Sequence, residues 1–188
     1  MSVYTLPNEG FFQQSAPVLA TGLLGGLLAR RWKGGWLTGV IIETEAYTED
    51  DPASHSFRGE SSRNRSMFRK GGHAYVYLIY GIHHCFNVTA GTPGSGEAVL
   101  VRALKPRQGL RTMMENRGRT DPEELCSGPG RLCRALGISL VQDGTDLRDG
   151  EIRLFPRRLP VKGNSIDVTE RIGISKGRRL KRRYLLVQ

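Results

Sequence analysis

The stretch Val40-Ile-Ile-Glu-Thr-Glu-Ala-Tyr47 constrains the fold of this chain more than any other. Its apolar and β-branched residues predict a strand that ends in two carboxylates and a tyrosine. Because side chains alternate along a strand, Glu43 and Glu45 should share one face, with Ala46 on the other. A carboxylate at the end of a buried strand is costly unless it is paired, hydrogen-bonded or chemically active. The strand therefore predicts a polar site within its sheet.

A second segment, Tyr75-Val-Tyr-Leu-Ile-Tyr80, places three tyrosines in six residues. In a strand, Tyr77 and Tyr80 would point to opposite faces, one toward a pocket and one away from it. An acid at one strand end beside aromatic rings on another strand suits a pocket for a flat substrate. Arg102 lies within a third apolar run, and a buried arginine usually has a carboxylate or phosphate partner.

The first part of the chain predicts a lead-in, a helix and a hairpin. Residues 1–10 should be irregular, because their proline and glycine discourage regular structure. Residues 15–24 predict a short helix with Ser15 as its N-cap and a proline in the first turn. The segments 27–32 and 36–47 should pair across a glycine turn as a hairpin.

The middle of the chain predicts an antiparallel meander. Residues 75–80, 85–90 and 97–104 are strand-like and are separated by turns, and Pro106 should end the last of them. Before this meander, Asp51-Pro52 predicts the start of a further helix.

The remaining segments complete an α+β pattern, because strands and helices are segregated rather than alternating. At 188 residues, one compact domain is expected. We therefore predict a single domain over residues 1–188 with a curved antiparallel β-sheet and surrounding short helices. The later helices are expected over 107–117, after Asp121 and over 131–136 before Gly137, and the later strands over 151–155 and 184–187.

The charge balance is strongly positive, with 28 lysines and arginines against 18 acidic residues. The net charge of +10 indicates a polyanionic partner, most simply nucleic acid, with a generally basic protein as the alternative. Residues 57–70 contain five basic side chains and one acid, which suits either a phosphate clamp or a solvated loop.

Three cysteines, Cys85, Cys126 and Cys133, are too few for a disulfide framework. We expect them to be reduced, the two later ones as buried apolar side chains, in a cytoplasmic protein that would be nucleoid-associated in a bacterium. The apolar stretch 16–28 is too short to span a bilayer and lacks the flanks of a secretory signal, so no membrane partner is expected.

Metal and nucleotide cofactors are not expected. His83 and His84 are adjacent and would diverge, and the chain has no HExxH or CxxC pattern. Its glycine-rich stretches match neither a phosphate-binding loop nor a dinucleotide fingerprint.

The residues that remain favour nucleic-acid binding and base processing. Enzymes that act on a base in duplex DNA extract it and stack it against aromatic side chains in a pocket. In such a pocket the carboxylate would be the general base for a water that attacks the sugar carbon.

Several multi-residue segments closely resemble the alkyladenine (3-methyladenine) DNA glycosylase family, in the family's order and near its spacing. The similarity covers roughly residues 10–185. The segments are Glu43-Thr-Glu-Ala-Tyr47, Arg63-Asn-Arg-Ser-Met-Phe68, Tyr75-Val-Tyr-Leu-Ile-Tyr-Gly81, Asn87, Val101-Arg-Ala-Leu-Lys-Pro106 and Leu125-Cys-Ser-Gly-Pro-Gly130.

The resemblance implies a monofunctional, monomeric DNA glycosylase of base excision repair. Such an enzyme flips alkylated or deaminated purines out of double-stranded DNA and hydrolyses the N-glycosidic bond to leave an abasic site. No lysine lies in a pocket motif as a Schiff-base nucleophile, so no lyase activity is expected.

The resemblance also implies roles for individual residues. Glu45 matches the general base, and Arg102 matches the arginine that holds the attacking water and this carboxylate. Tyr47 and His55 match residues on one side of the flipped base, with Tyr77 stacked on the other. The backbone amide of His55 is the expected donor to the base edge.

Five further residues are expected to contact DNA or select the base. Asn87 resembles the side chain that sterically screens purines with an extra exocyclic amine. Tyr80 matches the wedge that enters the duplex, with Ile82 beside it. Arg63 and Ser61, in the basic loop, are expected to bind DNA.

Each assignment has a structural alternative. Glu45 could serve only as an ion-pair partner of Arg102, Tyr77 could be a core aromatic, and His55 could only pack or cap. Glu43 and Tyr75 are expected to be structural.

Two other functions remain open on the sequence alone. One is a catalytically inactive DNA-lesion-binding module of the same fold, and the other is RNA-directed binding. The lesion is also open, between 3-methyladenine, 7-methylguanine, hypoxanthine and ethenoadenine, and no general acid is identified. Relative to the family, the C-terminal DNA contacts are expected to be shortened, because the chain ends soon after Tyr184. His83 and His84 replace larger side chains beside the wedge.

Overall fold

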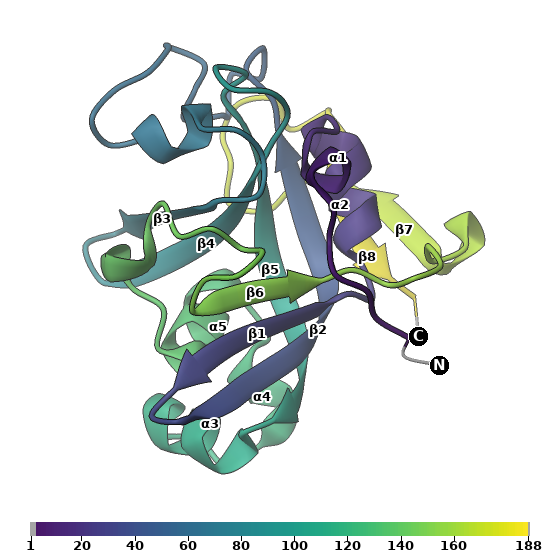
Figure 1. Cartoon of the computed structure of the whole chain (residues 1–188). Helices are drawn as coiled ribbons and strands as arrows, with labels where there is room; N and C mark the ends of the chain where they lie inside the picture. The colour runs from purple at the N-terminus through teal and green to yellow at the C-terminus, as the bar shows by residue number, and fades with distance from the viewer. Residues whose placement is uncertain (1–2, 188) are drawn as a thin grey trace.

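The computed structural model describes residues 3–187 and shows one curled antiparallel sheet with short helices around it (Figure 1). The predicted α+β class, single domain and curved sheet are confirmed. The strands of this sheet are β1 (Leu27–Trp32), β2 (Gly35–Tyr47), β3 (Ala74–Ile79), β4 (His83–Ala90), β5 (Glu97–Gln108), β6 (Ile152–Phe155), β7 (Ile166–Thr169) and β8 (Arg183–Leu186). The α-helices are α1 (Glu9–Phe12), α2 (Ala16–Leu23), α3 (Leu110–Arg117), α4 (Pro122–Leu125) and α5 (Pro129–Leu136), and the 3-10 helices are η1 (Arg65–Phe68), η2 (Leu140–Gln142) and η3 (Gly163–Ser165).

The sheet is organised around β2, the strand that contains the sequence stretch singled out first. The main strand order is β3-β4-β5-β2-β1-β6. The first half of β2 pairs with β1 and its second half pairs with β8, while β5 pairs along the opposite edge. A strand of 13 residues is long enough to hold two shorter strands on one edge. The two predicted hairpins, β1–β2 and β3–β4, are both present.

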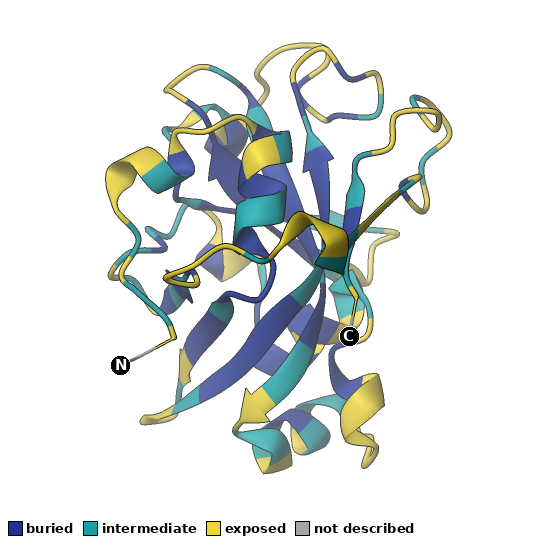
Figure 2. Cartoon of the chain, turned by 90° about the vertical axis from the view of Figure 1, so that its right-hand side faces the viewer, coloured by how far each residue is buried: buried dark blue, intermediate teal, exposed yellow. Residues whose placement is uncertain are grey.

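The core lies between the sheet and the helices α2, α3, α4 and α5. Helix α2 buries Ala16, Leu19, Ala20 and Leu23, and the Thr44 hydroxyl of β2 donates to the Ala20 carbonyl at 3.0 Å. Figure 2 shows buried strands at the centre and exposed outer helix surfaces. The second half of β2 is thereby held rigidly at its back face.

Two predicted helix ends in the α3–α5 region are confirmed. The Asp121 side chain accepts from the Glu123 amide at the start of α4, and Gly137 ends α5 with φ 63°. A Cβ at Gly137 would lie 2.2 Å from the Trp32 ring, so both the backbone conformation and the close approach require glycine.

Two expectations about element ends are wrong. Ser15 stands at the N-cap position of α2, but its side chain makes no capping hydrogen bond, and the first helical amide, that of Ala16, donates to the Glu97 carboxylate. Pro106 does not end its strand, since β5 continues to Gln108 across an irregularity in its pairing with β2. A proline is tolerated at a bulge because no ladder hydrogen bond is lost there.

The expected helix at Asp51-Pro52 is absent, and the segment forms turns. The Asp51 carboxylate accepts from the Ala53 amide and pairs with Arg171, so it serves a tertiary contact rather than a helix cap. At the N-terminus, α1 begins at Glu9, within the expected irregular lead-in of residues 1–10, whose first two residues lie outside the described range.

In the described range 3–187, no helix has both the length and the apolar character needed to cross a membrane.

Candidate active site

A cavity of about 790 Å³ is formed by the second half of β2, the strands β3 to β5, the start of α5 and the segment 172–176. Its walls include all the residues that the sequence assigned to catalysis or base binding, namely Glu45, Tyr47, His55, Tyr77, Asn87 and Arg102. The fold therefore gathers these side chains at one place, and their individual roles stay predictions.

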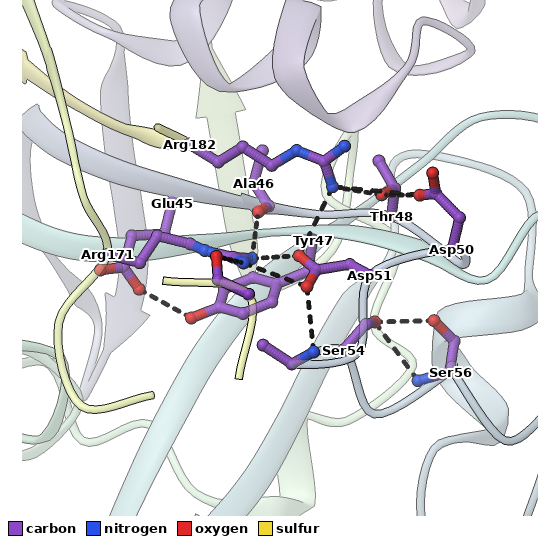
Figure 3. Close-up of polar contacts among 12 residues, drawn as sticks. Glu45, Ala46, Tyr47, Thr48, Asp50, Asp51, Ser54, Ser56, Arg171 and Arg182 are labelled. Atoms are coloured by element: carbon purple, nitrogen blue, oxygen red, sulfur yellow. Dashed lines mark hydrogen bonds and ion pairs between the residues drawn. The ribbon is translucent and has the colours of Figure 1, made fainter. Parts of the chain in front are cut away.

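Glu45 lies deep in the cavity, with its side chain shielded from solvent. Its Oε2 accepts from the Tyr47 hydroxyl at 2.8 Å (Figure 3). Its Oε1 accepts from the Ile172 backbone N–H at 2.8 Å. Arg102 adds an ion pair, with Nη1 3.3 Å from Oε1. Since a carboxylate offers about four acceptor positions, one position on Oε2 remains for a further donor such as water.

Arg102 is aimed into the site by a β-bulge. Glu43 pairs with Ala103 and Thr44 pairs with Val101, so Arg102 stands opposite no residue of β2. An extra residue of this kind breaks the regular alternation and turns its side chain toward a new direction. This irregularity brings the guanidinium to the carboxylates of β2.

Four charges alternate across the sheet at this point. Arg183 Nε lies 2.6 Å from Glu43 Oε1, the same oxygen lies 2.8 Å from Arg102 Nε, and Arg102 then reaches Glu45. Burial by itself lowers the pKa of Arg102, but Glu45 and Glu43 outweigh it and raise that pKa. The expectation that buried Arg102 has a carboxylate partner is confirmed, and Glu43 holds the far side of its guanidinium.

Tyr47 acts as a neutral hydrogen-bond donor. Burial, and then the neighbouring Glu45 carboxylate, raise the pKa of Tyr47 well above its ordinary value. The phenol therefore stays protonated near neutral pH and can donate to Glu45. The Arg171 guanidinium lies 4.6 Å from the centre of the Tyr47 ring and fixes its orientation by a cation–π contact.

An aromatic wall faces this carboxylate. Tyr75 is buried in a small apolar cluster, as expected for a structural residue, and its hydroxyl shares a hydrogen bond of 2.7 Å with His55 Nδ1. The His55 ring meets Tyr77 edge to face, with centroids 4.5 Å apart. Desolvation, and then the positive charge of Arg63, lower the pKa of His55, so its imidazole is neutral near pH 7.

Strand β4 supplies Asn87 and Cys85 to the cavity. The Asn87 amide group donates from Nδ2 to the Tyr75 carbonyl at 3.0 Å, which orients its Oδ1 away from β3. Burial raises the pKa of the Cys85 thiol, so this side chain stays a neutral thiol.

Tyr80 lies at the rim, in the turn between β3 and β4. Its φ is 52° and it is 80% exposed, so it is not part of the strand. The argument from strand alternation for Tyr77 and Tyr80 is therefore wrong, because alternation stops at Ile79. Ile82, in the same turn, is 72% exposed.

Arg63 and Ser61 lie outside the cavity wall, in the loop before η1. Arg63 Nη2 donates to the Leu78 carbonyl at 3.2 Å. The amide and the hydroxyl of Ser61 both donate to Asn64 Oδ1, so Ser61 helps to close a turn.

The sequence arguments missed a group of basic side chains on the far wall. Arg117, Arg119, Arg131 and Lys176 line the cavity, and Glu124 adds one acid there. Burial, and then the neighbouring arginines, lower the pKa of Arg117, which is the effect of cations crowded together. Only the resemblance of the segment 125–130 pointed to this wall.

The described residues contain no group of three or more His, Cys, Asp or Glu side chains placed to hold a metal ion. The protein groups alone offer a carboxylate with fixed donors, an adjacent guanidinium, flat aromatic rings and a basic rim. This set can orient and deprotonate a water beside a flat, anionic ligand.

Comparison with known proteins gives one consistent family. Residues 10–188 match the family model of methylpurine-DNA glycosylase. A protein of Methanoculleus marisnigri named "Putative 3-methyladenine DNA glycosylase" is 48% identical over 97% of this chain and 95% of its own length. A protein with the same name from Carboxydothermus hydrogenoformans is 44% identical over 96% of this chain and 94% of its own length. Another from Rubrobacter xylanophilus is 46% identical over 88% of this chain and 85% of its own length. The chain therefore belongs to the methylpurine-DNA glycosylase family.

Proposed function

We propose that this protein is a monofunctional DNA glycosylase that removes alkylated or deaminated purines from double-stranded DNA in base excision repair. The observation that carries the proposal is Glu45, a buried carboxylate held by Arg102, Tyr47 and Ile172 in an aromatic cavity with a basic rim. Its family and the names of its relatives support the same reaction. We place it in the cytoplasm, as a monomer on its DNA substrate.

In the proposed reaction, Glu45 accepts a proton from water through its free Oε2 position. The water oxygen then forms a bond to C1′ of the sugar while the N-glycosidic bond breaks and its electron pair leaves with the purine. A cationic alkylated purine leaves as a neutral base without further protonation, whereas a neutral deaminated purine leaves as its anion and takes a proton from solvent. Arg102 keeps the carboxylate in place and offsets its negative charge.

The shielding of Glu45 sets a requirement on this reaction. Water cannot reach the carboxylate in the present conformation, since the side chain has no accessible surface. The attacking water is therefore admitted by a small displacement of the cavity wall, while the hydrogen bonds from Tyr47 and Ile172 to Glu45 are kept.

The proposed base site lies against Tyr77. The rings of His55 and Tyr77 touch in this conformation, so a purine can enter between them only if they separate. His55 is more exposed than its neighbours and can turn about its single hydrogen bond to Tyr75. In this proposal Asn87, which is held by its hydrogen bond to the Tyr75 carbonyl, excludes purines with an extra exocyclic amine.

Tyr80→Ala is expected to slow single-turnover base release from duplex DNA by roughly tenfold, because Tyr80 no longer fills the space left by the flipped nucleotide and unstacking costs a few kcal/mol. The side chain is mostly exposed, so thermal stability should change little. The same lesion in a single strand is the control, and its release should slow much less. Equal losses on both substrates would contradict the wedge role.

Arg131→Gln is expected to weaken binding to damaged and undamaged duplexes alike. If Arg131 contacts a phosphate, the slope of log affinity against log salt should become less steep by about one. Arg153→Gln is the matched control, because Arg153 stacks on Trp36 and does not line the cavity. A salt slope unchanged in Arg131→Gln would remove this side chain from the DNA interface.

The proposed function is tested on end-labelled duplexes with a single hypoxanthine or ethenoadenine and on methylated DNA, with alkali to cleave abasic sites. We expect wild-type protein to produce alkali-labile sites on at least one substrate. Borohydride should trap no covalent complex even though Lys176 lines the cavity, because the proposed nucleophile is a water and not a lysine amine. Tight lesion binding without any abasic product would favour the inactive lesion-binding module instead.

A further inference from the structure

Arg171 and Asp51 form a buried ion pair that the proposed reaction does not use. Both side chains are fully buried, although the residues are 120 positions apart in sequence. Two nitrogens of the guanidinium donate to the two carboxylate oxygens, Nη1 to Oδ2 and Nη2 to Oδ1. Figure 3 shows this pair directly beside Tyr47 and Glu45.

The same guanidinium also contacts the strand that contains Glu45. Arg171 Nη1 donates to the Ala46 carbonyl at 3.0 Å, and its charge lies over the Tyr47 ring. The next residue along the chain, Ile172, donates its backbone N–H to Glu45 Oε1. Two adjacent residues of one segment thus contact three consecutive residues of β2.

The segment 171–177 is closed into a compact loop by the same arginine. Arg171 Nη2 donates to the Gly177 carbonyl at 3.3 Å. Gly177 has φ 62°, and a Cβ there would lie 2.9 Å from Asp51 Oδ1. Residues 172–176 between these ends form one wall of the cavity.

Stability alone does not account well for this pair. A buried ion pair gains little over apolar packing, because its charges are removed from water. Arg171 Nε, moreover, has no hydrogen-bond partner in the range 3–187. Arg182 also reaches Asp51, at 3.4 Å, and lies 4.0 Å from Asp50. Instead, these contacts hold the segment 171–177, and with it the Ile172 amide, in a fixed orientation relative to β2.

We propose that Arg171 and Asp51 are positioning residues, which lock the segment 171–177 against β2 so that the Ile172 amide holds Glu45 in its reactive orientation. This inference rests on the proposed function, since it assigns a purpose to the orientation of Glu45. Arg171 touches neither the substrate nor the water in this scheme. It acts through Tyr47, through the Ala46 carbonyl and through the neighbouring amide.

The sharpest test removes the amide hydrogen and leaves the ion pair in place. Ile172→Pro has no N–H, whereas Ile172→Ala keeps it and measures the cost of losing the side chain alone. We expect single-turnover base release at saturating enzyme to fall by about 100-fold in the proline variant, the scale expected when a reacting group is misplaced. The half-saturating enzyme concentration should change much less. The alanine variant should release base at least about tenfold faster than the proline variant.

Arg171→Lys provides a second measurement if the proline variant folds poorly. Lysine keeps the charge beside Asp51 but cannot reach Asp51, Ala46 and Gly177 together. We expect a single-turnover rate at least about tenfold below wild type, with the half-saturating concentration nearly unchanged. A purely structural role would instead lower the melting temperature and leave the rate of the folded fraction intact.

The outcomes separate the two proposals. If wild-type protein releases base, either of two results would overturn the positioning role alone. One is equal rates for Ile172→Pro and Ile172→Ala, and the other is a wild-type rate in Arg171→Lys. Absence of release by wild type on every lesion would overturn the proposed function, and the positioning role with it.

Discussion

Glu45→Gln is expected to reduce single-turnover base release by about 10³-fold, within the range that a general base contributes. Glutamine keeps the length of the side chain and one oxygen acceptor, for either the Tyr47 hydroxyl or the Ile172 amide. It cannot accept the proton of the attacking water. Binding to lesion DNA should be nearly unchanged, because Glu45 is shielded and makes its contacts within the protein. Single-turnover rates and fluorescence-anisotropy titrations on the same duplex measure the two effects.

Glu43→Gln is the matched control, because it changes an equal charge on the same strand and on the same arginine. It should reduce base release far less than Glu45→Gln, since Glu43 lies between two arginines and away from the free acceptor position. An equal loss of base-release rate in the two variants would mean that the rate depends only on the total negative charge beside Arg102. The assignment of Glu45 as the base would then fail.

Arg102→Met is expected to have the second largest effect, on both stability and rate. Removal of one partner from a buried pair typically costs ~3 kcal/mol, because the remaining carboxylate loses its counter-charge. The unpaired charge would be that of Glu45, since Glu43 keeps Arg183. Base release should fall by roughly 100-fold as the carboxylate loses its fixed position. Urea unfolding and single-turnover kinetics check the two quantities.

Arg183→Met tests whether the losses of stability and of base-release rate are specific to the removal of Arg102. Arg183 contacts the same Glu43 oxygen but forms no ion pair with Glu45, and Arg102 remains to neutralise both acids. We expect smaller losses of stability and of rate than in Arg102→Met. If Arg183→Met matched Arg102→Met in rate, the ion-pair to Glu45 would not be the reason for the loss.

Local sequence was sufficient for much of the sheet. The β1–β2 and β3–β4 hairpins follow from apolar strands separated by glycine-containing turns, a pattern that depends on near neighbours. The partner of Arg102 was predictable in kind, because a buried guanidinium requires a carboxylate or phosphate. The resemblance to a family added the grouping of Glu45 with His55 and Asn87, which no local rule supplies.

Long-range contacts explain where local sequence failed. Asp51 has the features of a helix cap, but its carboxylate is used by Arg171 from the far end of the chain. Pro106 was expected to end β5, and the strand passes through it because the pairing with β2 is irregular there. Tyr80 follows the alternating tyrosines, yet its left-handed backbone places it in a turn. The polar strand β7 was not expected, since it forms only by pairing with β8.

The most direct test of the central claim measures both products of one reaction. Wild-type protein and Glu45→Gln are each incubated in excess with a duplex that contains a single lesion, and mass spectrometry quantifies free purine and the abasic strand. The account predicts equal amounts of free purine and abasic strand for wild type, and neither for Glu45→Gln at the same time point. A lesion strand that stays intact in the presence of bound wild-type protein, or equal release by both proteins, would contradict it.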